Sequence, residues 1–148
     1  TNAITKSTAV ASSTSVTIAT STSPDPVDWT VVQSATITTN GGEIIVAANF
    51  NAICQEGSTS TFTRFGVEYN VYINNINMAQ NGRAYTTFVS GVTNFFAVPI
   101  SITTIRSGLA AGTYTVTVYA RRTGSDVAGS GASTSTATRS LVITEFKR

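Results

Sequence analysis

The chain has 148 residues, with nine Lys and Arg against seven Asp and Glu, no histidine and a single cysteine. This length fits one domain, and a net charge of +2 is too small to favour nucleic acid or an anionic membrane as a partner. Without histidine the chain lacks the commonest general base, and with one cysteine it can form no intrachain disulfide.

The first 28 residues differ in composition from the rest. They consist mainly of Ser, Thr and Ala and end in the breaker Pro24-Asp25-Pro26, but four β-forming residues recur among them: Ile4, Val10, Val16 and Ile18. We expect an N-terminal arm at residues 1–28 followed by one domain at residues 29–148. Two alternatives stay open, because the arm either packs on its own domain or docks on a neighbouring subunit through these four residues.

From Trp29 onward the dominant hydrophobic period is two, which is typical of β-strands with one buried face. The turn signals Asn40-Gly41-Gly42 and Asn81-Gly82 separate such segments, and Pro99 indicates an edge strand or a bulge. The alternation predicts strands at residues 31–39, 44–54, 67–73, 85–90, 95–104, 112–120 and 139–146.

The last predicted strand carries apolar side chains on both of its faces. Leu141 and Ile143 alternate on one face, and Val142 and Phe146 lie on the other, so we expect both faces to be at least partly covered. Residues 123–138 before it are polar and predict a long loop. Since no stretch has an apolar period of 3.6, the sequence predicts an all-β protein, an antiparallel β-sandwich or jelly roll.

Three segments resemble a known family. LAAGTYTVTVYARRTG and ATRSLVITEFKR resemble the closing strands of TNF/C1q-like jelly-roll domains in phage and bacterial fibre heads, and WTVVQSATITTNGGEIIVAANF resembles their opening strands. The resemblance implies a homotrimer in which strand faces pack around a threefold axis. We expect the subunit interface to include Trp29, Tyr119, Val142 and Phe146, although Trp29 also suits the junction between the arm and the domain.

The sequence argues against catalysis. No two of the seven acidic residues form a recognisable catalytic pair, and no zinc, calcium or phosphate-loop motif is present. Cys54 lies in an apolar stretch and is interpreted as a small hydrophobic residue rather than a nucleophile. We therefore expect no enzymatic activity, no metal and no cofactor.

Binding is the function class that remains. Tyr72, Tyr85, Arg121 and Arg122 are candidate ligand contacts, because aromatic rings with polar groups at their rim suit glycans and protein partners. The same tyrosines also suit a subunit interface, and both interpretations stay open.

The sequence favours a virion structural protein, a trimeric decoration protein on the outer surface of a capsid or another large assembly, which docks through its arm. The alternative is a head domain of a phage tail fibre or surface appendage that binds a host receptor or glycan. The sequence has no apolar run long enough to span a membrane and no basic, then apolar leader, which predicts synthesis in the host cytoplasm.

Overall fold

Strands account for nearly all of the chain that the structure describes. The computed structural model describes residues 3–19, 21–25, 28–55, 63–74, 76–77, 83–90, 95–123 and 133–147. Its strands are β1 (Ala3–Ser12), β2 (Val16–Thr17), β3 (Thr30–Thr39), β4 (Gly42–Gln55), β5 (Thr63–Ile73), β6 (Ile76–Asn77), β7 (Arg83–Ser90), β8 (Phe95–Leu109), β9 (Gly112–Thr123) and β10 (Ser133–Lys147).

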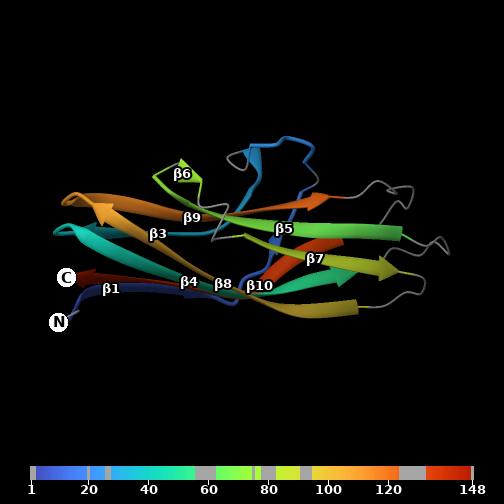
Figure 1. Cartoon of the computed structure of the whole chain (residues 1–148). Helices are drawn as coiled ribbons and strands as arrows, with labels where there is room; N and C mark the ends of the chain where they lie inside the picture. Colours follow the sequence, from blue (N-terminus) through green and yellow to red (C-terminus); the bar gives the residue numbers. More distant parts are fainter. Residues whose placement is uncertain are drawn as a thin grey trace.

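The strands form two sheets that pack face to face (Figure 1). Sheet A has the order β1-β10-β4-β8, with the short β2 also paired to β10. Sheet B has the order β3-β9-β5, and the side of β5 away from β9 pairs with β7 along residues 63–70 and with the short β6 at residues 72–73. All of these pairs are antiparallel, and they are nested along the chain: β1 with β10, β3 with β9, β4 with β8 and β5 with β7. This is the strand order of a jelly roll, and it confirms the predicted all-β sandwich.

The core lies between the two sheets, where the predicted alternation places it. On β4 the buried side chains are Ile44, Val46, Ala48, Phe50 and Ala52. The neighbouring strands add Val67, Tyr69, Val71, Ile73, Val116, Val118, Ala120, Leu141 and Ile143. Each of these strands therefore turns every second residue inward, as a period of two requires.

The turn between β3 and β4 shows why its glycines are required. Gly41 and Gly42 have φ angles of 96° and 139°, a region that side-chain-bearing residues rarely adopt. A Cβ on Gly42 would lie 2.8 Å from the backbone oxygen of Phe146. Glu145, which is fully buried, accepts a hydrogen bond of 2.9 Å from the Asn40 amide and so fixes the turn to β10.

The N-terminal segment belongs to the sandwich. β1 pairs with β10 from Ala3↔Lys147 to Ser12↔Arg139, which makes it an edge strand of sheet A and brings the two ends of the chain together (Figure 1). Ile18 is buried in the core, and Val10 and Val16 pack against it. Of the two alternatives for this segment, the structure has the one in which it packs on its own domain.

Two further expectations need comment. β10 begins at Ser133, and residues 133–137 pair with β4, so they do not belong to the predicted loop, because a polar Ser/Thr stretch can still form ladder hydrogen bonds. The predicted turn Asn81-Gly82 and the side chains of Ile4, Cys54 and Tyr85 lie outside the described residues.

Candidate functional site

The centre of the outer surface of sheet A is uncharged and combines apolar with small polar side chains. Its central side chains form rows across the paired strands, because directly opposed residues share a face. We call this surface the sheet A face and define it by Ser7, Ala9, Ala11, Ser140, Val142, Thr144, Ile45, Ala47, Asn49, Ser101, Thr103 and Ile105. None of these residues is charged.

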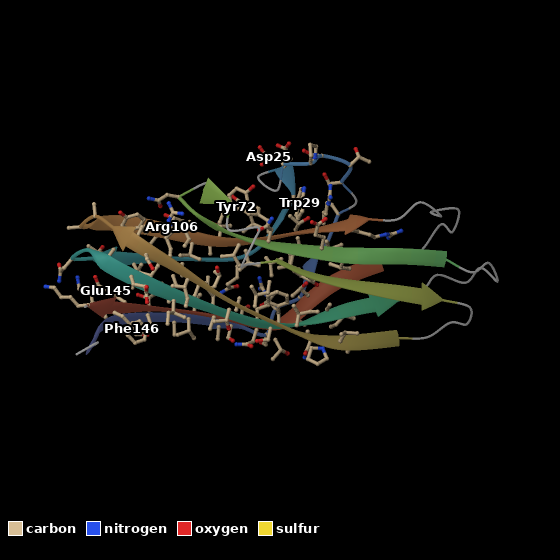
Figure 2. The ribbon with its side chains drawn as sticks, viewed as in Figure 1. Asp25, Trp29, Tyr72, Arg106, Glu145 and Phe146 are labelled. Carbon is tan, nitrogen blue, oxygen red and sulfur yellow. The ribbon has the colours of Figure 1, made fainter. Side chains whose placement is uncertain are left out.

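The sheet A face is open to solvent. Ile105 is 47% exposed, and Val142, Ile45 and Ala47 are shielded only in part, by their neighbours in the same sheet. Phe146 continues the face toward the end of β10 and points away from sheet B (Figure 2), where it is directly opposed to Glu43 of β4. Among the described residues no element lies across this surface (Figure 1). Apolar side chains that stay partly exposed at the centre of an uncharged surface make this face a candidate interaction site.

A hollow interrupts the sheet A face where β10 breaks its register. The pairing of β10 with β4 shifts between Ala137 and Ser140, and Thr138 adopts a φ of 48°. Such a bulge bends its strand and leaves residues unpaired. The resulting open hollow has a volume of about 850 Å³ and is lined mainly by small or amide side chains, among them Ala11, Ser13, Asn49, Asn51, Ser101 and Ser140.

Arg139 fixes the strands around the hollow. Its guanidinium donates hydrogen bonds to the backbone oxygen of Val32 in sheet B, to Ser12 Oγ at 3.0 Å and to the backbone oxygen of Thr14 at 2.9 Å. Because Arg139 is only 9% exposed, these bonds satisfy a charge that burial would otherwise destabilise. The residue therefore holds the end of β1 and both sheets together beside the bulge.

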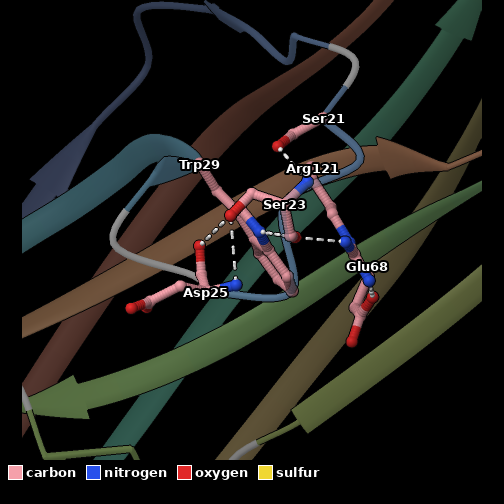
Figure 3. A network of polar contacts seen from close by, with 6 residues as sticks. All are labelled: Ser21, Ser23, Asp25, Trp29, Glu68 and Arg121. Atoms are coloured by element: carbon pink, nitrogen blue, oxygen red, sulfur yellow. Dashed lines mark hydrogen bonds and ion pairs between the residues drawn. The ribbon is translucent and has the colours of Figure 1, made fainter.

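The outer surface of sheet B is covered in part by the chain itself. A strap, described at residues 19, 21–25 and 28–29, crosses from sheet A to sheet B and leaves other outward residues of β3 open, among them Val31, which is 50% exposed. Figure 3 shows how the polar groups of the strap are held. Arg121 donates to Glu68 Oε2 from Nε at 2.9 Å and from Nη2 at 2.8 Å, and its Nη1 donates to the backbone oxygen of Ser23. The indole Nε1 of Trp29 donates to the same oxygen at 3.0 Å, and the guanidinium lies 4.3 Å from the centre of the Trp29 ring.

The strap changes the interpretation of two predicted ligand contacts. Tyr72 faces outward from sheet B as the alternation predicts, but it is only 5% exposed. Burial raises its pKa, and the negative charge of nearby Asp25 raises it further. Arg122 is 7% exposed, and its backbone holds the strap through Ala19 and Ser21. The prediction of both residues as free ligand contacts is therefore wrong, because sequence alternation does not reveal what another segment covers.

The remaining predicted residues divide between the two outer surfaces. Trp29 is buried under the strap and anchors the junction before β3, so it is not available for the predicted subunit interface. Tyr119 is half-buried and packs edge-on against Tyr72 with ring centres 5.4 Å apart. Arg121 is engaged with Glu68. Val142 and Phe146 are the predicted interface residues that lie on the accessible outer surface of sheet A.

Sequence reasoning missed several residues that organise these surfaces. Glu68, Arg139 and Glu145 were not singled out for structural roles, and Ile45 and Ile105 were not recognised as surface residues. The signal for the last two is the alternation along β4 and β8, whose central even-numbered residues are buried. Ile45 and Ile105 are odd-numbered and directly opposed, so both lie on the outer side. The contacts of Glu68 and Arg139 join residues far apart in the chain and have no local signal.

The described part of the chain offers no constellation for catalysis by a metal. Within it no group of three or more His, Cys, Asp or Glu side chains is placed to hold an ion. None of its residues forms a helix long and apolar enough to cross a membrane.

Comparison with known protein families finds no match, and comparison with curated proteins finds none either. Among solved structures, the chain has a likeness to the exo-β-1,3-galactanase of Phanerochaete chrysosporium, determined with galactose. The two are 15% identical with a TM-score of 0.28, and the match covers 97% of this chain but 30% of the enzyme. This chain thus corresponds to less than a third of that enzyme's length, and a likeness this weak carries no argument about function.

Proposed function

We propose that this chain is a non-enzymatic structural domain that assembles with copies of itself through the sheet A face. The observation that carries the proposal is the group of partly exposed apolar side chains Val142, Ile45 and Ile105 at the uncharged centre of sheet A, which no described part of the chain covers. The strap covers part of the outer surface of sheet B, where Val31 is 50% exposed. The larger group of partly exposed apolar side chains lies on sheet A, so we assign the contact between copies to that side.

The size of the sheet A face sets what a contact must include. Four strands spaced about 4.8 Å apart, with three outward residues on each spaced roughly 6.7 Å apart, give a surface of roughly 390 Å². Two such surfaces bury roughly 770 Å² together, so a specific interface of about 1,000 Å² also has to include neighbouring residues such as Phe146. The absence of charge on the twelve-residue patch also means that copies meet without like-charge repulsion.

A homotrimer is the assembly that the family resemblance favours, with the sheet A faces of three copies directed toward a common axis. In this arrangement Val142 and Phe146 lie at the contact, in agreement with the alternating apolar pattern of β10. A terminal strand with apolar side chains on both faces suits this position, because one face packs in the core and the other against the neighbouring copy.

We extend this proposal to a virion structural role, decoration of a capsid or another large assembly. The support is the composition without catalytic groups together with the resemblance to phage and bacterial fibre heads. The docking contact must differ from the one expected from the sequence, because Val10, Val16 and Ile18 are engaged with the chain's own core. The glycan-binding alternative is less well supported, since Tyr72 and Arg122 are buried.

The test replaces one side chain on each outer surface with lysine. Val142→Lys places a charge in the middle of the sheet A face, and Thr36→Lys places the same charge on an exposed position of β3 in sheet B. Sedimentation of the full chain should show that Val142→Lys shifts the assembly toward monomer while Thr36→Lys leaves it unchanged. Equal behaviour of the two folded variants would refute the proposal.

For the virion role, antibodies against this chain should label the outer surface of particles in electron micrographs. Particles that carry no label, in a preparation that contains the chain, would contradict this part of the proposal.

A further inference from the structure

β8 forms the second edge of sheet A and differs from ordinary edge strands. It pairs with β4 along its whole length, from Gly42↔Leu109 to Gln55↔Phe95, and it is the last strand in the order of the sheet. In proteins that stay monomeric, edge strands are usually short or carry Pro, Lys or bulges that prevent pairing with another chain. β8 spans Phe95–Leu109 and has such features at Pro99, at Arg106 and at the register shift between Arg106 and Leu109, which leaves residues 100–105 without any.

The segment between Pro99 and Arg106 has the composition of a strand that pairs. Residues 100–105, with the sequence ISITTI, are β-branched or Ser throughout and carry neither charge nor Pro. A six-residue stretch of this kind, exposed at an edge, is a template for strand addition. Ile105 is the large apolar side chain of β8 that is exposed, at 47%.

Pro99 indicates which backbone groups face the open side. It is opposed to Asn51 without any register shift at this pair, although proline has no N–H to give to a ladder. Proline is tolerated in an edge strand when its nitrogen faces away from the partner strand. We therefore infer that the odd-numbered residues of β8, Ser101, Thr103 and Ile105 among them, direct their N–H and C=O groups to the free edge.

From this arrangement we propose that two copies of the chain pair antiparallel through the free edges of β8, with Thr103 of each copy opposed on a two-fold axis. The alternation of side chains along β8 selects this register over one shifted by a single residue. Side chains opposed across a continuous sheet must lie on the same face, so odd residues meet odd residues. Centring on Thr103 opposes Ser101 to Ile105 and gives about six backbone hydrogen bonds, none of which needs the missing N–H of Pro99.

We assign the edge to a second copy of this chain because the positions of the two Arg106 residues permit the pairing. In this register Arg106 of one copy lies beside Ile100 of the other, and the two Arg106 residues are roughly 20 Å apart along the strands. That separation exceeds the screening length of about 8 Å at physiological salt, so the paired strands bring no like charges together. The pairing also joins the uncharged sheet A faces of the two copies into one continuous surface.

This contact is separate from the one made by the sheet A face, and either can be absent while the other holds. The face contact packs the outward side chains of sheet A, with Val142 of β10 near its centre, whereas the edge contact consists of main-chain hydrogen bonds of β8. Position 142 lies two strands in from the edge, so edge pairing keeps the two Val142 residues roughly 24 Å apart.

Disulfide formation between single cysteines tests the edge contact and its register. In a Cys54→Ala background of the full chain, Thr103→Cys places two thiols at opposed positions whose Cα atoms are about 5.5 Å apart, within the range for a disulfide. Ser101→Cys alone should not cross-link, but it should cross-link with Ile105→Cys when the two variants are mixed. Val142→Cys is the control for the face contact, and circular dichroism checks the fold of each variant.

We expect Thr103→Cys dimers to form at least about tenfold faster than Ser101→Cys dimers, because pairing raises the effective thiol concentration only at opposed positions. The mixture of Ser101→Cys and Ile105→Cys should yield the mixed dimer at a rate like that of Thr103→Cys. The proposal is overturned if Thr103→Cys cross-links no faster than Ser101→Cys, or if only Val142→Cys cross-links. The second result would leave the face contact intact and show that the edge is free.

Discussion

The ion pair of Arg121 and Glu68 holds the strap, and its removal should destabilise the chain more than its partial exposure suggests. The side chains are 17% and 4% exposed, and both guanidinium bonds to the carboxylate converge on one oxygen. Glu68→Leu leaves the guanidinium of Arg121 with its bond to Ser23 and its contact with Trp29, but without a counter-charge. A buried charge that loses its partner is the costly case.

The magnitude follows from the burial of the pair. Removing one partner of a buried pair lowers the free energy of unfolding by about 3 to 5 kcal/mol. Because Arg121 is partly exposed, we expect about 3 kcal/mol for Glu68→Leu. The double variant Glu68→Leu, Arg121→Met removes both charges, so it should lose about 2 kcal/mol less than the sum of the single variants. At roughly 3 °C per kcal/mol for a chain of this size, Glu68→Leu should lower the melting temperature by about 9 °C.

The assay is a double-mutant cycle of urea unfolding, run at one protein concentration because self-association adds to the apparent stability. Lys147→Met, at an exposed end of β10, is the matched control and should change the free energy of unfolding by no more than about 0.5 kcal/mol. If the effects of Glu68→Leu and Arg121→Met add within about 0.5 kcal/mol, the pair does not act as a unit and the account of the strap is wrong.

Two further predictions concern the core and the β3–β4 turn. Burial raises the pKa of Tyr69 from 10.0 to about 12, so the folded state keeps the neutral phenol while the unfolded chain ionises. The contribution of Tyr69 to the free energy of unfolding is therefore fully present below pH 10. As the pH rises from 10 to 12, the free energy of unfolding should fall by about 3 kcal/mol, as measured by urea unfolding. Tyr69→Phe should remove most of this loss, at a cost of about 1 kcal/mol for the bond to Thr136, and an unchanged pH profile would exclude Tyr69 as its source. Gly42→Ala should destabilise the chain by more than about 1 kcal/mol, because its φ is positive and its Cβ meets the Phe146 backbone, whereas Gly112→Ala meets only the Tyr114 side chain at 3.7 Å. Equal melting temperatures of the two alanine variants would contradict the role assigned to Gly42.

Local pattern was enough to predict most of the strands and their inward faces. β4 and β9 were found because their apolar residues alternate without interruption, and the turn at Asn40 was found because glycine is needed where φ is positive. The sandwich class followed from these strands and from the absence of helical periodicity. The order in which strands pair is less local, and here the family resemblance pointed to the jelly roll.

The features that the sequence did not reveal depend on contacts between distant segments. β1 is rich in Ser and Thr and was interpreted as an arm, because its pairing with β10 uses backbone groups that any residue supplies. Tyr72 and Arg122 were interpreted as exposed because nothing in their own strands indicates the strap. The sheet A face was predicted only at β10, where Val142 and Phe146 interrupt the expected polar side of the strand.

The most direct test of the central claim is the mass of the wild-type chain in solution. Each chain has a mass of 15.4 kDa, and sedimentation equilibrium at micromolar concentration should give species in multiples of three chains, with Val142→Lys abolishing them and leaving no species larger than the dimer paired through β8. A wild-type chain that remains a stable monomer of 15.4 kDa under these conditions would contradict assembly through the sheet A face.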